Sequence, residues 1–313
     1  MMKNFFRLTW IFGALFYVST LAARPALAGE VTLEDSQLLV AFDSDSGALT
    51  RLEDKSTRWV IERRPELGVS FRLFAPLPNR RWDPVLGQKQ HAVEVKKISD
   101  NEIRLQWKNL ISESDGILPM TLTADVTLTN GVLTFNATLQ NDSSLTVETI
   151  DYPYFGDFNP PSRDTSKMEA RTMRRFSPDD LISDEIYPRF RNEHGYWGDF
   201  WPLKTLESWH SLFCLIQSPD QGLYVEVDAD KSPYRLQYTF EQHPGLVSAI
   251  TQLVPKEDEI GGKPVHLEFR TCHFIFEHPH STMKLVPIVL RCYKGDAQAG
   301  ADLYKQWRST FAR

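Results

Sequence analysis

The feature that most constrains the fold is a strict two-residue alternation on both sides of an Asn-Gly pair, Asn130-Gly131. Asn-Gly readily adopts the positive φ angles of a two-residue β-hairpin turn. Alternation gives each flanking strand one buried face and one wet face, and so it predicts a long antiparallel hairpin lying on a core. Apolar residues hold every second position: Leu122, Ala124, Val126 and Leu128 before the pair, then Leu133, Phe135, Ala137 and Leu139 after it.

Similar short apolar runs bounded by turn residues recur along most of the chain, and they predict roughly fifteen strands. The first read V-T-L-E, Q-L-L-V-A-F-D and, after the turn D-S-D-S-G, A-L-T-R-L-E-D. Between Phe155 and Phe200 the pattern breaks into irregular sequence, with one short strand expected near Lys167–Met173. Many strands without a repeat or a linker favour one all-β fold, a large two-sheet antiparallel β-supersandwich over residues 29–295.

Only the last segment changes its period. Leu303, Trp307 and Phe311 recur at four-residue spacing, and Asp296 before them is a residue type that suits a helix N-cap. We therefore expect one C-terminal helix over residues 296–313, either packed on the sandwich or leading out of it.

The first 28 residues have the pattern of a secretory signal peptide. Lys3 and Arg7 form a positive segment, an apolar run follows, and Ala26-Leu27-Ala28 supplies small residues for cleavage. The apolar run is shorter than the ~20 residues that a membrane span needs. Removing residues 1–28, which carry three basic residues and no acid, changes the net charge from −6 to −9. We expect a secreted or periplasmic protein that binds neither nucleic acid nor, after cleavage, a membrane, because phosphate surfaces are held by surplus Lys and Arg.

Three cysteines, Cys214, Cys272 and Cys292, lie inside apolar runs. One disulfide would be possible in an exported chain, but the apolar surroundings favour buried thiols.

The sequence gives no cofactor motif. His278-Pro-His280 has no third ligand at a usual metal-site spacing, so we expect surface histidines, no metal and no cofactor. The arginines between Arg163 and Arg191 are nearly balanced by acids, which favours a salt-bridged, solvated segment over an anion site.

An aromatic stretch from Glu193 to Trp209 is the main candidate for function, and it reads E-H-G-Y-W-G-D-F-W-P-L-K-T-L-E-S-W. Glycines and a proline interrupt it, so we expect a loop or short strand ends. Indole rings stack on the C–H face of a pyranose, while carboxylates and imidazole bond its hydroxyls. The alternative is that these rings fill the core. The predicted substrate-binding residues are Glu193, His194, Tyr196, Trp197, Asp199 and Trp201.

Acid–base chemistry on a sugar needs a carboxylate or histidine pair facing a cleft. The candidates are His210, which follows the aromatic stretch, and Glu226 and Asp228 on the segment G-L-Y-V-E-V-D-A-D. If that segment is a strand, Tyr224, Glu226 and Asp228 share one face, and that face could line a groove. The alternative is an ordinary solvated strand face.

Several segments resemble galactose-mutarotase-like β-sandwich domains, which occur in mutarotases and at the front of many glycoside hydrolases. The opening Q-L-L-V-A-F-D-S-D-S-G-A-L-T-R-L-E-D is similar to their first hairpin. I-D-Y-P-Y-F-G-D-F, D-Q-G-L-Y-V-E-V-D-A-D and A-D-L-Y-K-Q-W-R resemble segments of multi-domain glycosidases. The resemblance implies a sandwich that faces sugar.

In those glycosidases a helix leads from the sandwich into a (β/α)-barrel. This chain stops where the barrel would begin, so the resemblance carries over no barrel carboxylates, and the mutarotases' own His and Glu positions do not match well enough to transfer. A separately encoded catalytic barrel is therefore a candidate partner. Three functions stay open: a sandwich that binds an oligo- or polysaccharide; a glycosidase-, lyase- or mutarotase-like enzyme using a His/carboxylate pair; and a structural or interaction protein.

Overall fold

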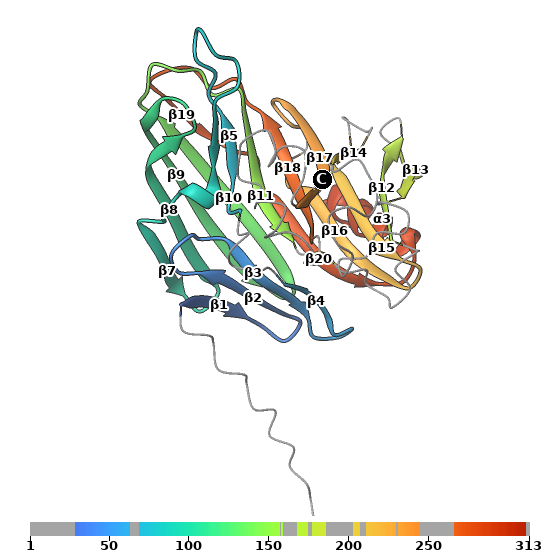
Figure 1. The fold of residues 1–313 in the computed structure, drawn as a ribbon. Helices are drawn as coiled ribbons and strands as arrows, with labels where there is room; N and C mark the ends of the chain where they lie inside the picture. Colours follow the sequence, from blue (N-terminus) through green and yellow to red (C-terminus); the bar gives the residue numbers. More distant parts are fainter. Residues whose placement is uncertain are drawn as a thin grey trace, which may run out of the picture.

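The computed structural model describes residues 29–62, 69–156, 158, 168–174, 177–185, 203–206, 211–229, 231–243 and 266–310. The predicted signal peptide, residues 1–28, lies outside these ranges. The described residues form twenty β-strands and one α-helix, α3, so the predicted all-β fold class is confirmed. Figure 1 shows the strands as two facing layers with α3 on the outer side of one of them.

The first layer is an antiparallel sheet built around the predicted hairpin. β7 (Glu94–Ser99) joins it on β8, and β19 (Ser281–Lys284) joins it on β10. Its main path runs through β8 (Glu102–Ser112), β9 (Gly116–Thr129), β10 (Val132–Asn141), β20 (Ile288–Lys294), β16 (Gln221–Val227), β15 (Phe213–Ser218), β12 (Glu169–Arg174) and β13 (Ser177–Glu185).

The second layer continues the same hydrogen-bonded path and faces the first. The two layers join where β6 pairs with β8 through Val85 and Ser112. The second layer contains β6 (Pro84–Leu86), β5 (Arg72–Phe74), β11 (Thr149–Gly156), β18 (His266–Phe274), β17 (Arg235–His243) and β14 (Leu203–Thr205).

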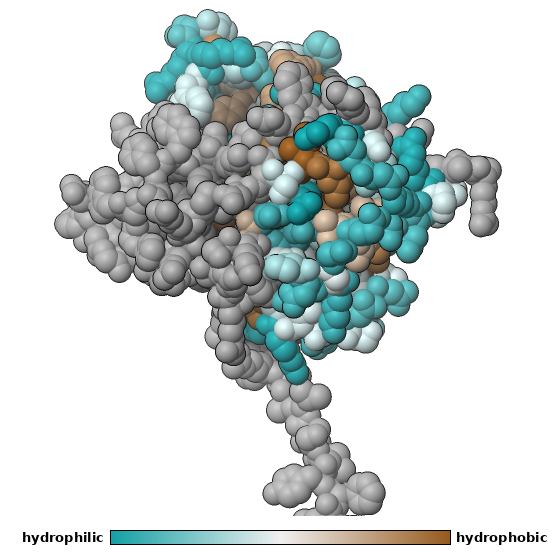
Figure 2. Space-filling model, turned by 90° about the vertical axis from the view of Figure 1, so that its right-hand side faces the viewer, coloured by the Kyte–Doolittle hydropathy of each residue, from teal (hydrophilic) through white to brown (hydrophobic). Residues whose placement is uncertain are grey.

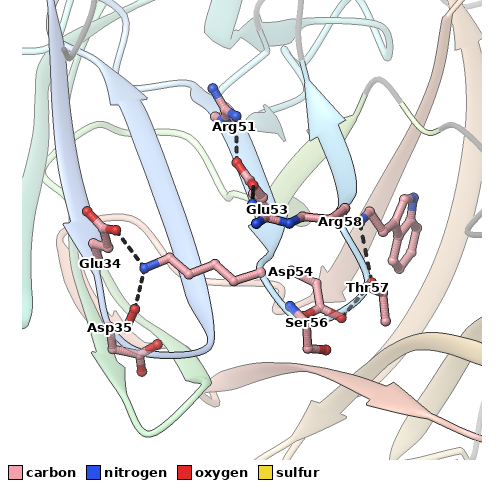
Figure 3. A network of polar contacts seen from close by, with 10 residues as sticks. Glu34, Asp35, Arg51, Glu53, Asp54, Ser56, Thr57 and Arg58 are labelled. Carbon is pink, nitrogen blue, oxygen red and sulfur yellow. Dashed lines mark hydrogen bonds and ion pairs between the residues drawn. The ribbon is translucent and has the colours of Figure 1, made fainter. Parts of the chain in front are cut away.

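A separate four-stranded sheet extends the sandwich at one end (Figure 1). It consists of β1 (Glu30–Glu34), β2 (Leu38–Asp43), β3 (Leu49–Asp54) and β4 (Trp59–Glu62). Figure 3 shows the polar contacts that fix its turns: Lys55 Nζ lies 2.6 Å from Glu34 Oε1, and the Asp54 carboxylate accepts from Ser56 N and Thr57 Oγ1. The Asp35 carboxylate accepts from Gly131 N at 2.6 Å and so ties this sheet to the β9–β10 turn.

The β9–β10 hairpin forms as the Asn130-Gly131 pair predicts. Thr129 pairs with Val132, and the two turn residues have φ angles of 51° and 74°. The alternating apolar side chains of both strands are buried in the space between the layers. There they meet the second layer, for example where the rings of Phe135 and Tyr152 lie 5.8 Å apart.

The C-terminal helix α3 (Ala297–Ser309) also forms where the sequence predicts it. Asp296 is its N-cap, and its side chain accepts from the backbone N–H groups of Gln298 and Ala299. The helix packs on the first layer and does not lead away from it. Tyr304 and Ala301 are buried against Phe213 and Tyr224 in a second, smaller apolar cluster. The Phe213 and Tyr304 rings are 4.9 Å apart.

The region expected to be irregular holds a second strand that the sequence did not reveal. β12 matches the expected strand near residues 167–173, but β13 pairs with it over Ser177–Glu185. Its sequence, S-P-D-D-L-I-S-D-E, lacks alternation because β13 is an edge strand with half-exposed and exposed residues. The three-residue strands β6 and β14 were also not expected, because they are too short to show a period, whereas β5 lies inside a segment, residues 68–75, that reads as a strand.

Candidate functional site

Most of the sequence-predicted site lies outside the described residues. This holds for all six predicted substrate-binding residues, Glu193, His194, Tyr196, Trp197, Asp199 and Trp201, and for the catalytic candidate His210. Glu226 and Asp228 are described. The chain connectivity around the aromatic stretch is also defined, because β13 ends at Glu185 in the first layer and β14 begins at Leu203 in the second. Residues 186–202 therefore link the edge strands of the two layers.

Glu226 lies on β16 and is fully buried, with no exposed side-chain surface. Its face of the strand is the one that carries Tyr224, as predicted, but this face neither lines an open groove nor contacts solvent. Tyr224 donates its hydroxyl hydrogen to Glu226 Oε2. Among the described residues Oε1 has no hydrogen-bond partner. Burial raises the pKa of Glu226 to about 7, although Tyr224 and the Arg291 guanidinium both favour the charged form.

Asp228 lies just past the end of β16, at the rim of the same face. Its Oδ1 accepts from Trp307 Nε1 of α3 at 2.8 Å. The structure therefore brings Glu226 and Asp228 to one side of the first layer, but it gives them different surroundings. A carboxyl group whose pKa lies near neutrality can give or take a proton at physiological pH. Glu226 has that property, and its access to solvent is closed.

A second group of charged residues lies on the outward face of the second layer, where the sequence analysis named no candidate. Arg72 Nε donates to Asp151 Oδ2 at 2.8 Å, and Arg270 Nε lies 3.3 Å from the same oxygen. These side chains come from three neighbouring strands, β5, β11 and β18. Arg72 is 3% exposed, Asp151 2% and Arg270 8%, so the group is buried although it points away from the apolar core.

The register extends this polar face across the layer. Tyr154 pairs with Arg270, and both guanidinium groups lie within 6 Å of the Tyr154 ring centre. Arg270 in turn pairs with Thr239 of β17, and Thr239 pairs with Thr205 of the edge strand β14. The register thus connects the polar face to β14, a strand that lies within the aromatic stretch. We refer to Arg72, Asp151, Tyr154, Arg270 and Thr239 below as the outer polar face.

The sequence contains a weak signal for this face. Arg72 stands between Phe71 and Leu73, and Arg270 follows Phe269, so each charge interrupts an apolar strand at an alternate position. A charge in such a place signals either a solvated face or a buried pair. Only the strand order, which places β5, β11 and β18 side by side, brings Asp151 between the two arginines.

The remaining predicted features are structural. The three cysteines, all of which are described, form no disulfide; Cys214 is buried, and Cys272 and Cys292 are partly buried. Burial raises the pKa of the Cys272 and Cys292 thiols, which makes them poor nucleophiles. His278 and His280 are exposed, and the described ranges contain no cluster of metal-ligating residues. In the same ranges no helix has the length and apolarity of a bilayer crossing.

An open polar pocket of about 330 Å³ lies where the turns of the four-stranded sheet meet the end of β20. Its lining includes Asp54, Lys55 and Lys294. Lys55 is held by Glu34, and both oxygens of Asp54 accept hydrogen bonds within their own turn (Figure 3). The polar groups of this pocket mainly stabilise the turns.

Comparisons with known proteins place the fold. No family model matches the sequence, and a search of curated proteins found no match. Among solved structures, a galactose mutarotase-like protein from Lactobacillus casei has a TM-score of 0.52 at 14% identity, covering 85% of this chain and 100% of that one. A galactose mutarotase related enzyme from Lactobacillus acidophilus has a TM-score of 0.48 at 11% identity, covering 84% and 97%.

An alpha-galactosidase from Lactobacillus brevis matches 85% of this chain but only 40% of its own length, with a TM-score of 0.48 at 7% identity. At these identities the structural likeness speaks to fold and not to activity. The first similarity, with a TM-score of 0.52 over 85% of this chain, supports the β-sandwich fold described above. The chain therefore has the fold of the galactose mutarotase-like β-sandwich proteins.

Proposed function

We propose that this protein is an exported, carbohydrate-binding β-sandwich whose ligand is an oligo- or polysaccharide. The fold supports this, because the similar structures are a galactose mutarotase-like protein and, over part of its length, an alpha-galactosidase. The observation that carries the proposal is the outer polar face, a buried group of arginine, carboxylate, hydroxyl and aromatic side chains on one side of the second layer. These are the groups that bond sugar hydroxyls and stack on sugar rings.

The aromatic stretch supplies the second part of the proposed site. It contains the edge strand β14, whose register leads through Thr239 to Arg270. We assign Trp197 and Trp201 the stacking role, with Tyr196 beside them. Glu193, His194 and Asp199 are assigned to the sugar hydroxyls. A neutral saccharide is favoured, because Arg72 and Arg270 are offset on this face by Asp151 and Glu268, and the mature chain carries a net charge of −9.

A glycan array followed by calorimetry tests the proposal with three matched variants. Trp197→Ala and Trp201→Ala should each weaken binding by about five- to 150-fold, if stacking of a sugar ring on an indole is worth the roughly 1–3 kcal/mol found for nucleic-acid bases on aromatic side chains. Trp307→Ala, on the opposite layer, should leave the affinity unchanged. If either stacking variant instead lowers the melting temperature sharply while the remaining folded protein binds normally, the ring belongs to the core and the platform assignment is wrong.

Thr239→Val tests the outer polar face separately. The exchange keeps the shape of the side chain but removes its hydroxyl, so a lost hydrogen bond to the sugar should cost about 1 kcal/mol, or roughly fivefold in affinity. Unchanged affinity in this variant, together with a loss in the tryptophan variants, would confine the site to the aromatic stretch.

A catalytic role is the second candidate, and the near-neutral pKa of Glu226 is the observation that favours it. In that reading His210 pairs with Glu226 or Asp228 in acid–base chemistry on a sugar. Sugar turnover and anomer-exchange NMR test it: Glu226→Gln should abolish any activity that the wild-type protein shows. Equal rates in both proteins would remove Glu226 from the chemistry.

Export and partnership are the remaining parts of the proposal. N-terminal sequencing of protein recovered from secreted or periplasmic fractions should find Gly29 as the first residue, and recovery of an uncleaved chain only from the cytoplasm would contradict export.

A separately encoded catalytic barrel is the proposed protein partner. Co-purification with an adjacent barrel-only gene product is the test, and failure of the two proteins to bind leaves the sandwich acting alone.

A further inference from the structure

The helix α3 covers part of the outer side of the first layer. Where Figure 2 colours the described residues on this side, the surface is mainly hydrophilic, with a small group of hydrophobic side chains among polar ones. The helix lies flat on β15 and β16, and its buried residues are Gly300, Ala301 and Tyr304. α3 is therefore an amphipathic cover on the first layer and not an extension of the sheet.

Glu226 lies beneath this cover. It is the register partner of Phe213, whose ring contacts Tyr304 of α3 at 4.9 Å. It bonds Tyr224, which belongs to the same apolar cluster as Tyr304. Two residues further along, Asp228 bonds Trp307 of the helix. Contacts with α3 thus flank the Glu226 carboxyl group on both sides along the strand.

Few charges compensate Glu226 in this position. From β20, Arg291 attracts it, but the buried Nε of Arg291 has no hydrogen-bond partner among the described residues. From β16, Tyr224 donates to it, and the Asp228 carboxylate repels it. Among the described residues, the Tyr238 phenol of β17 also interacts with Glu226, and Arg308 Nη1 of α3 donates to the Tyr304 hydroxyl at 3.0 Å.

We propose that Glu226 makes the seating of α3 sensitive to pH: the helix is held firmly while Glu226 is protonated, and it opens more often once Glu226 is ionised. The physical reason is desolvation. A carboxylate with one unpartnered oxygen is poorly accommodated under an apolar cover, and lifting the helix lets water solvate it. Protonation of Glu226 removes this desolvation cost, because the neutral carboxyl group needs only the contact with Tyr224.

The size of the effect follows from linkage. The pKa of Glu226 is about 7 in the closed state and would return toward the ordinary 4.5 when the helix is lifted. A group that binds its proton more tightly in the closed state stabilises that state at low pH and loses the effect as pH rises from 4.5 to 7. The difference of about 2.5 pKa units corresponds to an upper limit of roughly 300-fold in the opening equilibrium.

Hydrogen–deuterium exchange of the purified protein measures that equilibrium. After correction for intrinsic exchange, the peptide covering residues 297–310 should show an opening constant that rises between pH 4.5 and 7 and then levels off. Peptides from the β9–β10 hairpin report global unfolding, in which the opposite pH dependence of buried His273 offsets that of Glu226, so their opening constant should change much less. A pH-independent opening constant in α3, or a parallel change in the hairpin, overturns the proposal.

Three variants identify the titrating group. Glu226→Gln should give an opening constant that stays flat over this pH range. Asp228→Asn, which retains an oxygen to accept from Trp307, should keep the wild-type pH dependence. Trp307→Phe should raise the opening constant of α3 at every pH and keep its ratio between pH 7 and pH 4.5. This variant provides the test if Glu226→Gln does not fold. Loss of the pH dependence in Asp228→Asn or Trp307→Phe, or its persistence in Glu226→Gln, contradicts the role of Glu226.

Discussion

At the scale of single residues, the most unusual feature is the number of charges buried away from water. Arg72, Asp151 and Arg270 form one such group on the second layer, and Glu226 is another on the first. Their surroundings differ in kind. Asp151 is held between two guanidinium groups, whereas Glu226 has one phenol as its hydrogen-bond partner among the described residues and a pKa near neutrality.

The Asp151 group gives a direct stability prediction. Asp151→Asn leaves two buried arginines without their carboxylate, and breaking a buried ion pair in this way should cost about 3–5 kcal/mol in unfolding free energy. Asp125→Asn is the matched control, because Asp125 also pairs with an arginine across neighbouring strands, Arg104 at 2.7 Å, but in a partly exposed position. That variant should cost less than about 1 kcal/mol. Urea denaturation compares the two, and equal losses would show that burial does not govern the Asp151 group.

At the scale of elements, the β9–β10 hairpin is the clearest case in which local sequence sets local structure. Its turn also receives a tertiary contact, because Gly131 N donates to Asp35 Oδ2 and Gln37 lies against the turn. The turn is therefore more constrained than Asn-Gly alone would make it.

Two glycine substitutions separate these effects. Gly131 and Gly116 both have positive φ angles, 74° and 71°, so alanine strains the backbone at either position by about 1 kcal/mol. An added Cβ meets Gln37 Oε1 at 2.3 Å in Gly131→Ala but nothing within 4 Å in Gly116→Ala. Thermal unfolding should therefore show the larger loss for Gly131→Ala. Identical losses would mean that Gln37 moves aside freely.

At the scale of the whole molecule, two buried titrating groups act on stability in opposite directions. His273 is buried on β18, and Nε2 donates to the Tyr152 carbonyl at 2.7 Å. Burial lowers its pKa to about 4. The unfolded chain takes up this proton below the ordinary 6.5 and the folded chain does not, so His273 reduces stability as pH falls from 6.5 to 4. Glu226 reduces stability as pH rises from 4.5 to 7.

Each group contributes on the order of 3 kcal/mol over its range, and the two contributions nearly cancel. Glu226→Gln should remove one of them and leave a protein whose unfolding free energy rises from pH 4 to 6.5 and exceeds the wild-type value at pH 8. Denaturation at pH 4.5, 6 and 8 measures this. A variant that is less stable than the wild type at pH 8 would show that the Glu226 carboxylate is well accommodated.

The free thiols give a second prediction at this scale. Because Cys214, Cys272 and Cys292 form no disulfide, a reducing agent should leave the melting temperature unchanged. A thiol reagent should label three groups per denatured chain and far fewer per native chain, since burial raises the pKa of Cys272 and Cys292. A drop in melting temperature on reduction would reveal a disulfide in solution.

The sequence alone determined the features that depend on neighbouring residues. Alternation around Asn130-Gly131 specified the hairpin, and Asp296 with its four-residue spacing specified α3, because turn geometry and capping are local. The same reasoning placed Glu226 on one strand face with Tyr224. It did not reveal β13, whose edge position requires no alternation.

Only the tertiary structure decided what each face meets. It closed α3 over Glu226, although the sequence had suggested a groove or solvent, and it brought Asp151 between two arginines that lie 79 and 119 residues away along the chain. Burial and charge pairing arise from strands that are distant in sequence, and no local pattern encodes which strands become neighbours. The acid–base character of Glu226 and the outer polar face are consequences of that long-range order.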